Sequence, residues 1–245
     1  MERKLRSILS IIIFIAVWEI IGRFPNVPHY LFPPFSKVAL KLFIERDLLL
    51  RNILITSLRV AAGFVIGGVG GIVLGLLTGI NKRVDQFITP IVSLIYPIPV
   101  VGWIPLLMIW FGISNSVPII SVFICSFFPI FLNTVRGVKD VDENIIYAAR
   151  IMGTSGVQLI TKIILPLALP NIFTGLKLES GMSLRTGVVA EMLAIPSGLG
   201  YLLMKGESLI DTQLIFAVLI TMGIISFLID CTIRRIEKRL LIWKD

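Results

Sequence analysis

The chain has 245 residues, of which 56% belong to the apolar set and 16% are charged, and its mean hydropathy is +0.94. An ordinary soluble domain has about 25% charged residues, so this composition excludes a water-soluble globule. A membrane-spanning helix takes roughly 20 apolar residues. The length therefore allows several spans and leaves no room for a separate catalytic or nucleotide-binding domain.

Basic residues outnumber acidic ones by 23 to 15, and they lie mostly between and beyond the apolar runs. There they bear on membrane topology rather than on nucleic-acid binding. The apolar runs predict six spans, at 8–22, 53–80, 87–111, 117–135, 171–195 and 213–232. Fourteen Lys and Arg residues fall on the side of the two termini and six on the opposite side, which predicts that both termini are cytoplasmic.

Residues 1–52 are expected to form the first transmembrane helix, an outer loop and a short amphipathic helix. The first apolar run lacks a small-residue cleavage site, so we interpret it as an uncleaved helix rather than a signal peptide. The proline-rich stretch 25–34 is expected to be irregular. Ser36 has the chemistry to cap the amphipathic helix that follows, which carries charges up to Asp47 and is too polar to span.

Glycines recur at a strict four-residue spacing in the second span. Small residues at this spacing let helix backbones approach closely in lipid. The stripe predicts either a static packing face or a surface that slides during gating. Its members are Gly63, Gly67, Gly71, Gly75 and Gly79.

Prolines interrupt the third span, since Pro97, Pro99 and Pro105 exclude a regular helix through its middle. Broken helix at membrane depth is tolerated only where it is buried in protein or lines a cavity. The break therefore indicates a translocation path, with a simple structural kink as the alternative. The candidate path residues here are Ser93, Tyr96 and Trp103.

The fifth span carries Arg185 and Glu191 in otherwise apolar sequence. Charges inside a membrane usually face a bundle interior or a cavity, so both are candidates for the path. Six residues apart they lie about 240° around one helix and do not face each other. Arg185 suits an anionic substrate; the alternatives are a structural partner for Glu179 and a residue at the end of the span.

The segment 136–170 is the longest loop on the side of the termini. Its pattern predicts a helix, a glycine turn at Gly153, a second helix and a stop at Pro166. A folded loop with an apolar face needs a surface on which to dock. The alternative is an ordinary amphipathic connector.

This loop resembles the cytoplasmic EAA motif of binding-protein-dependent ABC importer permeases. The resemblance rests on Ala148-Ala149, Gly153 and Ile163-x-Leu165-Pro166. Further segments, in the same order and spacing, resemble the subfamily that serves nitrate, sulfonate, taurine and bicarbonate importers. These are 59–64, 96–106, 110–112, 128–134, 190–192 and 198–200.

The resemblance implies an all-α integral membrane protein with six transmembrane helices and the type I ABC importer permease (MetI-like) fold. It implies a permease core over 53–235, with the coupling loop 136–170, and a basic cytoplasmic tail over 236–245. It adds Asn133 to the candidate path. Tyr147 stands at the family's usual glutamate position. The residues expected to couple the chain to an ATPase are Tyr147, Ala148, Ala149, Gly153, Ile163, Leu165 and Pro166.

No G-x-x-x-x-G-K-S/T sequence occurs in the chain, so ATP and Mg are expected on a partner ATPase. We expect no catalytic residue, metal or cofactor in this chain. The resemblance implies two ATPase subunits, a second permease copy and an extracytoplasmic solute-binding protein in the cytoplasmic membrane. The expected function is the pore of an ATP-driven importer for a small anionic or organic solute such as sulfonate, taurine, nitrate or bicarbonate. The alternative, an ion-gradient-driven secondary transporter, favours paired broken helices.

Overall fold

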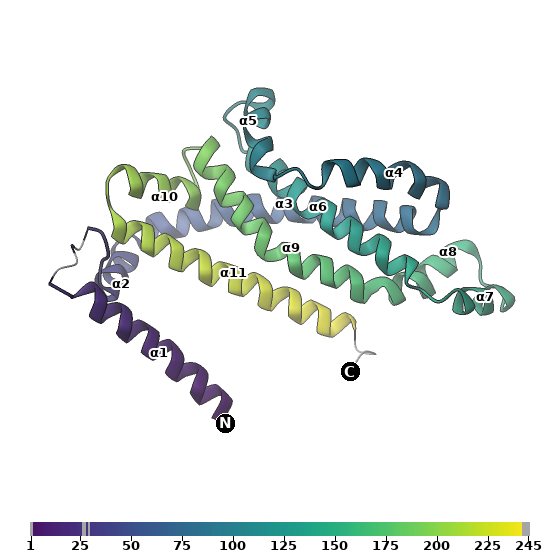
Figure 1. Cartoon of the computed structure of the whole chain (residues 1–245), viewed down its shortest axis with the longest axis horizontal. Helices are drawn as coiled ribbons and strands as arrows, with labels where there is room; N and C mark the ends of the chain where they lie inside the picture. The colour runs from purple at the N-terminus through teal and green to yellow at the C-terminus, as the bar shows by residue number, and fades with distance from the viewer. Residues whose placement is uncertain (1, 26–27, 29, 242–245) are drawn as a thin grey trace.

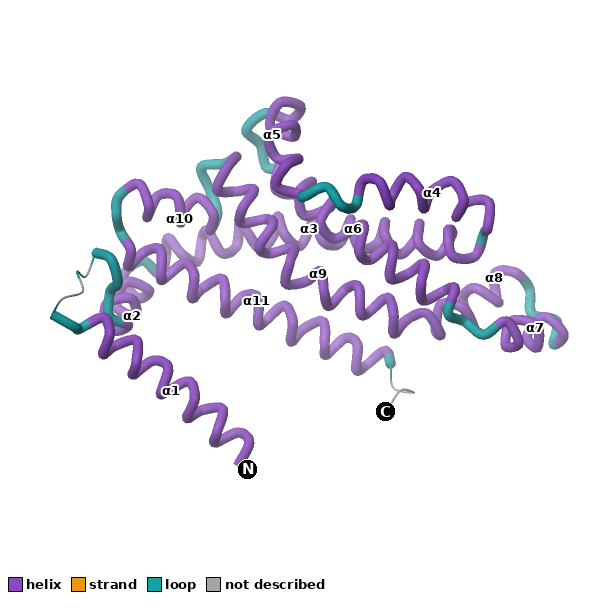
Figure 2. The backbone as a smooth tube through the Cα atoms, in the orientation of Figure 1, coloured by secondary structure: helices purple, strands orange, loops and turns teal. Residues whose placement is uncertain are grey.

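The computed structural model describes residues 2–25, 28 and 30–241, and all regular structure in this part of the chain is helical (Figures 1 and 2). The elements in chain order are α1 Glu2–Gly22, α2 Phe35–Ile44, α3 Arg46–Ile80, α4 Lys82–Ile95, α5 Val100–Phe111, α6 Ser116–Lys139, α7 Glu143–Ile151, α8 Gly156–Leu159, the π-helical turn η1 Ile160–Ile164, α9 Leu165–Ala194, α10 Leu199–Ser208 and α11 Thr212–Leu240.

The long helices α3, α6 and α9 form the centre of the molecule, with α6 packed along both of the others. The helix α11 runs beside α9, and the short helices α2 and α10 lie at one end of the bundle, opposite α7 and α8 (Figure 1). In the same view, α1 and α11 both direct their chain-terminal ends toward the α7 and α8 end.

The glycine stripe of α3 faces α6. A Cβ atom at Gly71 would lie 2.8 Å from the carbonyl oxygen of Phe127, and one at Gly75 would lie 2.7 Å from Cβ of Thr134. The other three glycines of the stripe are equally crowded by α6, whereas a Cβ atom at Gly70 would lie 3.5 Å from the nearest ring atom. The stripe thus lets two helix backbones approach more closely than larger residues would allow.

Four helical stretches among the described residues are long and apolar enough to cross a membrane: α3, α6, the continuous stretch Gly156–Ala194, and α11. The pair α4 and α5 gives a fifth if it counts as one broken span, because the two helices are bent by 93°. The apolar part of α1, Leu9–Gly22, is shorter. The predicted apolar runs are therefore helical apart from the break in the third, but only four of them, or five with the broken pair, are long and apolar enough to span.

The predicted cap at Ser36 is wrong. Pro34 occupies the N-cap of α2, and Ser36 lies in the first turn. Its hydroxyl and its backbone N–H donate to the carboxylate of Glu19 on α1, at 2.8 and 2.9 Å. The boundary predicted between residues 52 and 53 falls inside α3, since α2 ends at Ile44 and α3 begins at Arg46.

The predicted helix stop at Pro166 is also wrong. The π-helical turn η1 precedes Pro166, and the helix runs on without interruption from Gly156 to Ala194. Pro166 lies at the start of α9. Its missing N–H therefore falls where the backbone hydrogen bonds change from the π-helical to the α-helical pattern. The loop predicted over 136–170 shrinks to 140–155 between α6 and α8. The predicted tail begins inside α11, and residues 242–245 lie outside the described part.

Candidate functional site

The break in the third apolar run lies between α4 and α5, at Tyr96–Pro99, as predicted from Pro97 and Pro99, but the prediction is wrong for Pro105, which lies inside α5. Pro97 has no N–H with which to continue the α4 hydrogen-bond ladder, and the chain turns through a bond from the N–H of Ile98 to the carbonyl of Ile95, at 3.0 Å. The helix axes then diverge by 93°. This break opens one wall of a cavity.

The cavity, here called the break pocket, has a volume of about 390 Å³. It lies where the α4–α5 connection meets α6 and α9. Aromatic rings form part of its wall, with the centroids of Tyr96 and Phe128 6.4 Å apart. Its lining residues are Tyr96, Pro97, Ile98, Pro99, Val100, Ile124, Cys125, Phe128, Pro129, Glu179 and Met182.

Glu179 supplies the carboxylate of the break pocket although it is only 7% exposed. Cys125 donates its thiol hydrogen to Glu179 Oε2, at 3.4 Å, and Cys125 Sγ in turn accepts from the hydroxyl of Thr186, at 3.2 Å. Within residues 30–241, no basic side chain pairs with Glu179. The alternative in which Arg185 is the partner of Glu179 is therefore wrong.

The other predicted path residues are dispersed. Tyr96 lines the break pocket, whereas Ser93 is exposed on α4. Trp103 is half-buried on α5, and its indole N–H is buried without an acceptor in the described chain. Asn133 donates to the carbonyl of Pro129, at 2.8 Å. The structure thus brings one of these four residues to the break pocket.

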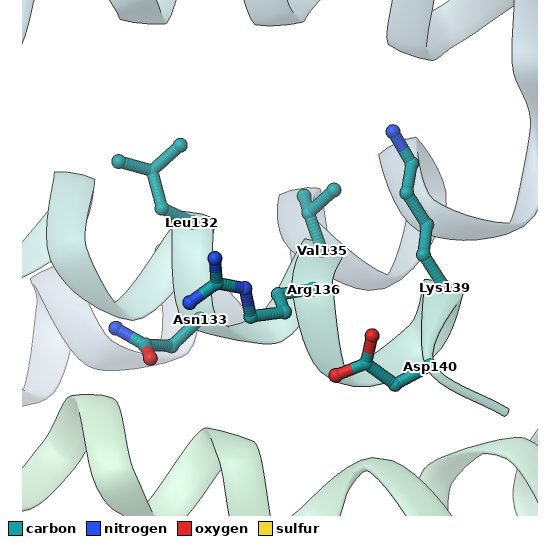
Figure 3. A pocket seen from close by; sticks show the side chains of 6 residues that line it. All are labelled: Leu132, Asn133, Val135, Arg136, Lys139 and Asp140. Atoms are coloured by element: carbon teal, nitrogen blue, oxygen red, sulfur yellow. The ribbon is translucent and has the colours of Figure 1, made fainter.

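Asn133 lines a second cavity, of about 540 Å³, at the end of α6 nearest α7 (Figure 3). Beside this cavity Lys139 pairs with Asp85 of α4, at 2.6 Å, and Asp140 accepts from the side chain of Asn171, at 3.1 Å. These contacts fix the end of α6 against both neighbouring helices. The lining residues are Leu132, Asn133, Val135, Arg136, Lys139 and Asp140.

Arg185 is exposed and lines a groove of about 560 Å³ between α9 and α11. Lys177 and Arg234 line the same groove, together with Asp230. Basic groups therefore outnumber the acidic group in it. The groove lies on the α11 side of α9, whereas the break pocket lies where α9 meets α6.

Glu191, by contrast, is buried and paired. It is 1% exposed, and its Oε1 accepts from Nη1 of Arg59, at 2.8 Å. The remaining guanidinium hydrogens go to the side chain of Asn115 and to the side chain and carbonyl of Ser197. The prediction that Glu191 lines a path is not supported, because the side chain holds the protein together instead.

The same carboxylate of Glu191 accepts from the hydroxyl of Thr56 and from the backbone N–H of Gly200, at 2.8 and 3.1 Å to Oε2. Gly198 has φ +99°, and any side chain there would strike the carboxylate. Three of the motif segments, at 59–64, 190–192 and 198–200, therefore meet in one buried network that joins α3, α9 and α10.

Sequence reasoning did not find Arg59 as the partner of Glu191. The signal was present, since two opposite charges in separate apolar runs are expected to pair inside a bundle. Cys125 lies in an apolar run without a motif around it, and only the fold shows that it faces the same cavity as Glu179.

The segment 140–159 folds as predicted into two short helices around a glycine turn. Gly153 has φ +80°, a conformation that favours glycine. The turn closes through bonds from the N–H of Gly153 to Arg150 and from the N–H of Thr154 to Ala149, at 3.0 and 3.1 Å. Ser155 and Gln158 form a capping box at the start of α8.

One face of the stretch from this segment to Pro166 is buried and the other is exposed. Ala149 and Ile164 pack with residues of α6 and α9, whereas Tyr147 is 59% exposed. Ile151 and Met152, beside the turn, are 88% and 86% exposed. Ala148 and Gly153 are exposed, and Ile163, Leu165 and Pro166 are half-buried. The predicted coupling residues thus divide between the buried face and the exposed face. The exposed face carries an apolar tip, formed by Ile151 and Met152.

Comparisons with known proteins bear on these features. A family model described as "Binding-protein-dependent transport system inner membrane component" matches residues 71–242. The aliphatic sulfonates transport permease protein SsuC of Bacillus subtilis (strain 168) is 31% identical over 98% of this chain and 88% of that protein. The taurine transport system permease protein TauC of Escherichia coli (strain K12) is 30% identical over 97% of this chain and 89% of that protein.

Solved structures agree on the fold. A chain of the MetNI methionine ABC transporter in an inward-facing conformation matches with a TM-score of 0.65 and 22% identity, over 80% of this chain and 97% of that chain. A chain of an amino acid ABC transporter matches with a TM-score of 0.62 and 18% identity, over 81% and 95%. The all-α permease fold expected from the sequence is confirmed.

Proposed function

Because this chain belongs to the family of binding-protein-dependent inner membrane components of ABC importers, we propose that two copies of it enclose the path of a small solute. The chain is a multi-pass permease subunit of the inner membrane. The ATPase of such a transporter is a separate subunit, and a binding protein delivers the solute. Membership in this family sets aside the ion-gradient-driven alternative.

The proposed orientation places both termini and the α7–α8 segment in the cytoplasm. The excess of Lys and Arg on the side of the termini supports it. In this orientation α2 and α10 lie at the outer face, where the binding protein would dock.

The observation that carries the proposed coupling role is the apolar tip of the α7–α8 segment. Ile151 and Met152 are almost fully exposed, yet the segment sits at the charged end of the bundle, outside the apolar spans. An ordinary connector has little use for such a tip, whereas a docking element does. We assign it to a groove of the ATPase, which binds ATP and Mg, with one ATPase under each copy.

The second copy is expected against the face of α4 and α5. Leu94 and Ile109 are 78% and 80% exposed there, and the connection between the two helices lines the break pocket. A homodimer would place two such pockets around one path. A broken helix is tolerated at such an internal surface.

The names of the relatives suggest a sulfonate or a similar solute, and Arg185 is suited to attract its anionic group. Uptake tests this function: vesicles holding the permease, its ATPase and its binding protein should accumulate the solute that copurifies with the binding protein only when ATP is supplied. Uptake that is indifferent to the ATPase would overturn it.

A further inference from the structure

The break pocket combines a buried carboxylate with aromatic and apolar walls, and the function proposed above assigns it no ligand. Glu179 is 7% exposed and lines the pocket. Its hydrogen-bond partner in the described structure is a thiol, Cys125, at 3.4 Å. A thiol is a weak donor, so this carboxylate retains most of its capacity to accept.

The lining supplies acceptors rather than cationic donors. None of the eleven lining residues is Lys, Arg or His. Pro97 and Pro99, which line the pocket, have no N–H to donate to a solute. The C-terminal end of a helix also carries a partial negative charge. These features favour a positively charged or N–H-bearing group beside Glu179.

Val100, the first residue of α5, also lines the pocket. The first N–H groups of a helix have no partner within that helix and attract negative charge. A solute with an ammonium group at one end and an acid group at the other therefore finds a complement for each end, at Glu179 and at the start of α5. An inorganic anion carries no positive group that could pair with the carboxylate of Glu179.

We propose that the break pocket is a transit site that binds the ammonium group of a small zwitterionic or amine-bearing organic solute through Glu179. The proposal rests on the importer function proposed above and narrows its substrate class. Nitrate, bicarbonate and simple alkanesulfonates are excluded as preferred solutes, whereas an aminosulfonate fits. The rings of Tyr96 and Phe128 cover the apolar body of the solute and add cation–π attraction.

Cys125 offers a direct probe, because its thiol lies in the pocket beside the carboxylate. In the full transporter with Cys231 replaced by Ser, the rates of modification by 2-(trimethylammonium)ethyl methanethiosulfonate and 2-sulfonatoethyl methanethiosulfonate are compared. The matched control is the Cys125→Ser variant, which reports on Cys231 of α11. We expect the cation-to-anion rate ratio at Cys125 to exceed that at Cys231 by about tenfold or more, since the reagents carry opposite charges near Glu179.

The Glu179→Gln variant should bring the two ratios together, and Glu179→Asp, which keeps the charge, should preserve the difference. Equal ratios in the protein with native Glu179, or a difference that persists in Glu179→Gln, would overturn the proposal. Should Glu179→Gln fail to reach the membrane, the comparison of Cys125 with Cys231 in the presence of Glu179 still decides.

A competition experiment tests the solute class. Taurine and ethanesulfonate differ by one ammonium group, so taurine should slow modification of Cys125 by the cationic reagent at a concentration where ethanesulfonate does not. Equal effects of the two solutes, or none from taurine, would contradict the assignment. ATP-dependent uptake is measured in parallel. If ATP-dependent uptake persists but the modification of Cys125 shows no preference for the cationic reagent, only this inference is refuted. Uptake that does not need the ATPase refutes the importer function.

Discussion

Nη1 of Arg59 and Oε1 of Glu191 lie 2.8 Å apart although 132 residues separate them in the chain. Both side chains are buried, at 6% and 1% exposure, and the partners of Arg59 include both Asn115 and Ser197. The pair therefore joins α3, the start of α6 and the turn after α9 at the end of the bundle that we assign to the outer face.

Replacing Glu191 with Gln should destabilise the protein by about 3–5 kcal/mol, because it leaves the guanidinium of Arg59 buried without its counter-charge. The matched control is Asp230→Asn, which breaks the exposed i,i+4 pair with Arg234 and should cost less than about 1 kcal/mol. Thermal unfolding of the two purified variants in detergent compares them. Similar shifts in the unfolding temperature of the two variants would show that the buried pair stabilises the protein no more than the exposed pair does.

The α3–α6 contact should tolerate no side chain at Gly71. A methyl group there would meet the backbone of Phe127 at 2.8 Å, whereas at Gly70 the nearest atom, on a ring of the same residue, is 3.5 Å away. Gly71→Ala should therefore destabilise the protein by about 1–3 kcal/mol through overpacking, and Gly70→Ala should have little effect. Unfolding in detergent again provides the measurement, and equal stability of the two variants would argue against close packing.

The coupling role predicts that Gly153→Asp leaves the protein in the membrane but abolishes association with the ATPase. Aspartate would strain the turn at φ +80° and place a charge beside Ile151 and Met152. Gly112 has φ +66° with open space around it and follows α5, away from α7 and α8, so Gly112→Asp is the matched control. Affinity purification of the permease measures the ATPase retained. Normal retention by Gly153→Asp would remove this segment from the interface.

The contact between α2 and the turn before α11 predicts a pH dependence. Lys41 and Asp211 pair at 2.7 Å. The hydrogen bond to Asp211 raises the pKa of Lys41. Burial acts to raise the pKa of Asp211, but the hydrogen bonds from Lys41 and from the N–H of Leu214 lower it below its ordinary value of 3.8.

Because the pKa of Asp211 is lowered in the folded protein, its contribution to stability is fully present above the ordinary pKa of 3.8 and is lost as the pH falls below that value through the lowered pKa. For Lys41 the contribution disappears only as the pH rises above 10.5. Asp211→Asn keeps an oxygen for the N–H of Leu214 but removes the charge. Its deficit in stability should be below about 1 kcal/mol near neutral pH and vanish in acid; a deficit that grows in acid would contradict this.

The sequence predicted the fold well where one pattern was sufficient. The glycine stripe from Gly63 to Gly79 and the prolines at 97 and 99 have local meaning, so the packing face and the helix break follow from residue type alone. Gly153 likewise predicts its own turn, since few other residues adopt its conformation.

It failed where a residue's role depends on distant partners. Glu191 reads as a path residue in isolation, and its burial follows only from the meeting of α3 with α9. Pro166 reads as a stop, yet the π-helical turn before it lets the helix continue. The break pocket combines residues of three separate segments, and neither Glu179 nor Cys125 could be assigned to it before the fold was known.

In the proposed function this chain is the passive pore of an importer driven through its α7–α8 segment. The most direct measurement is uptake of the solute that copurifies with the binding protein into vesicles that hold the permease and its ATPase, with and without ATP. We expect ATP-dependent accumulation with the native permease and none with Gly153→Asp. Accumulation without ATP, or undiminished accumulation with Gly153→Asp, would contradict it.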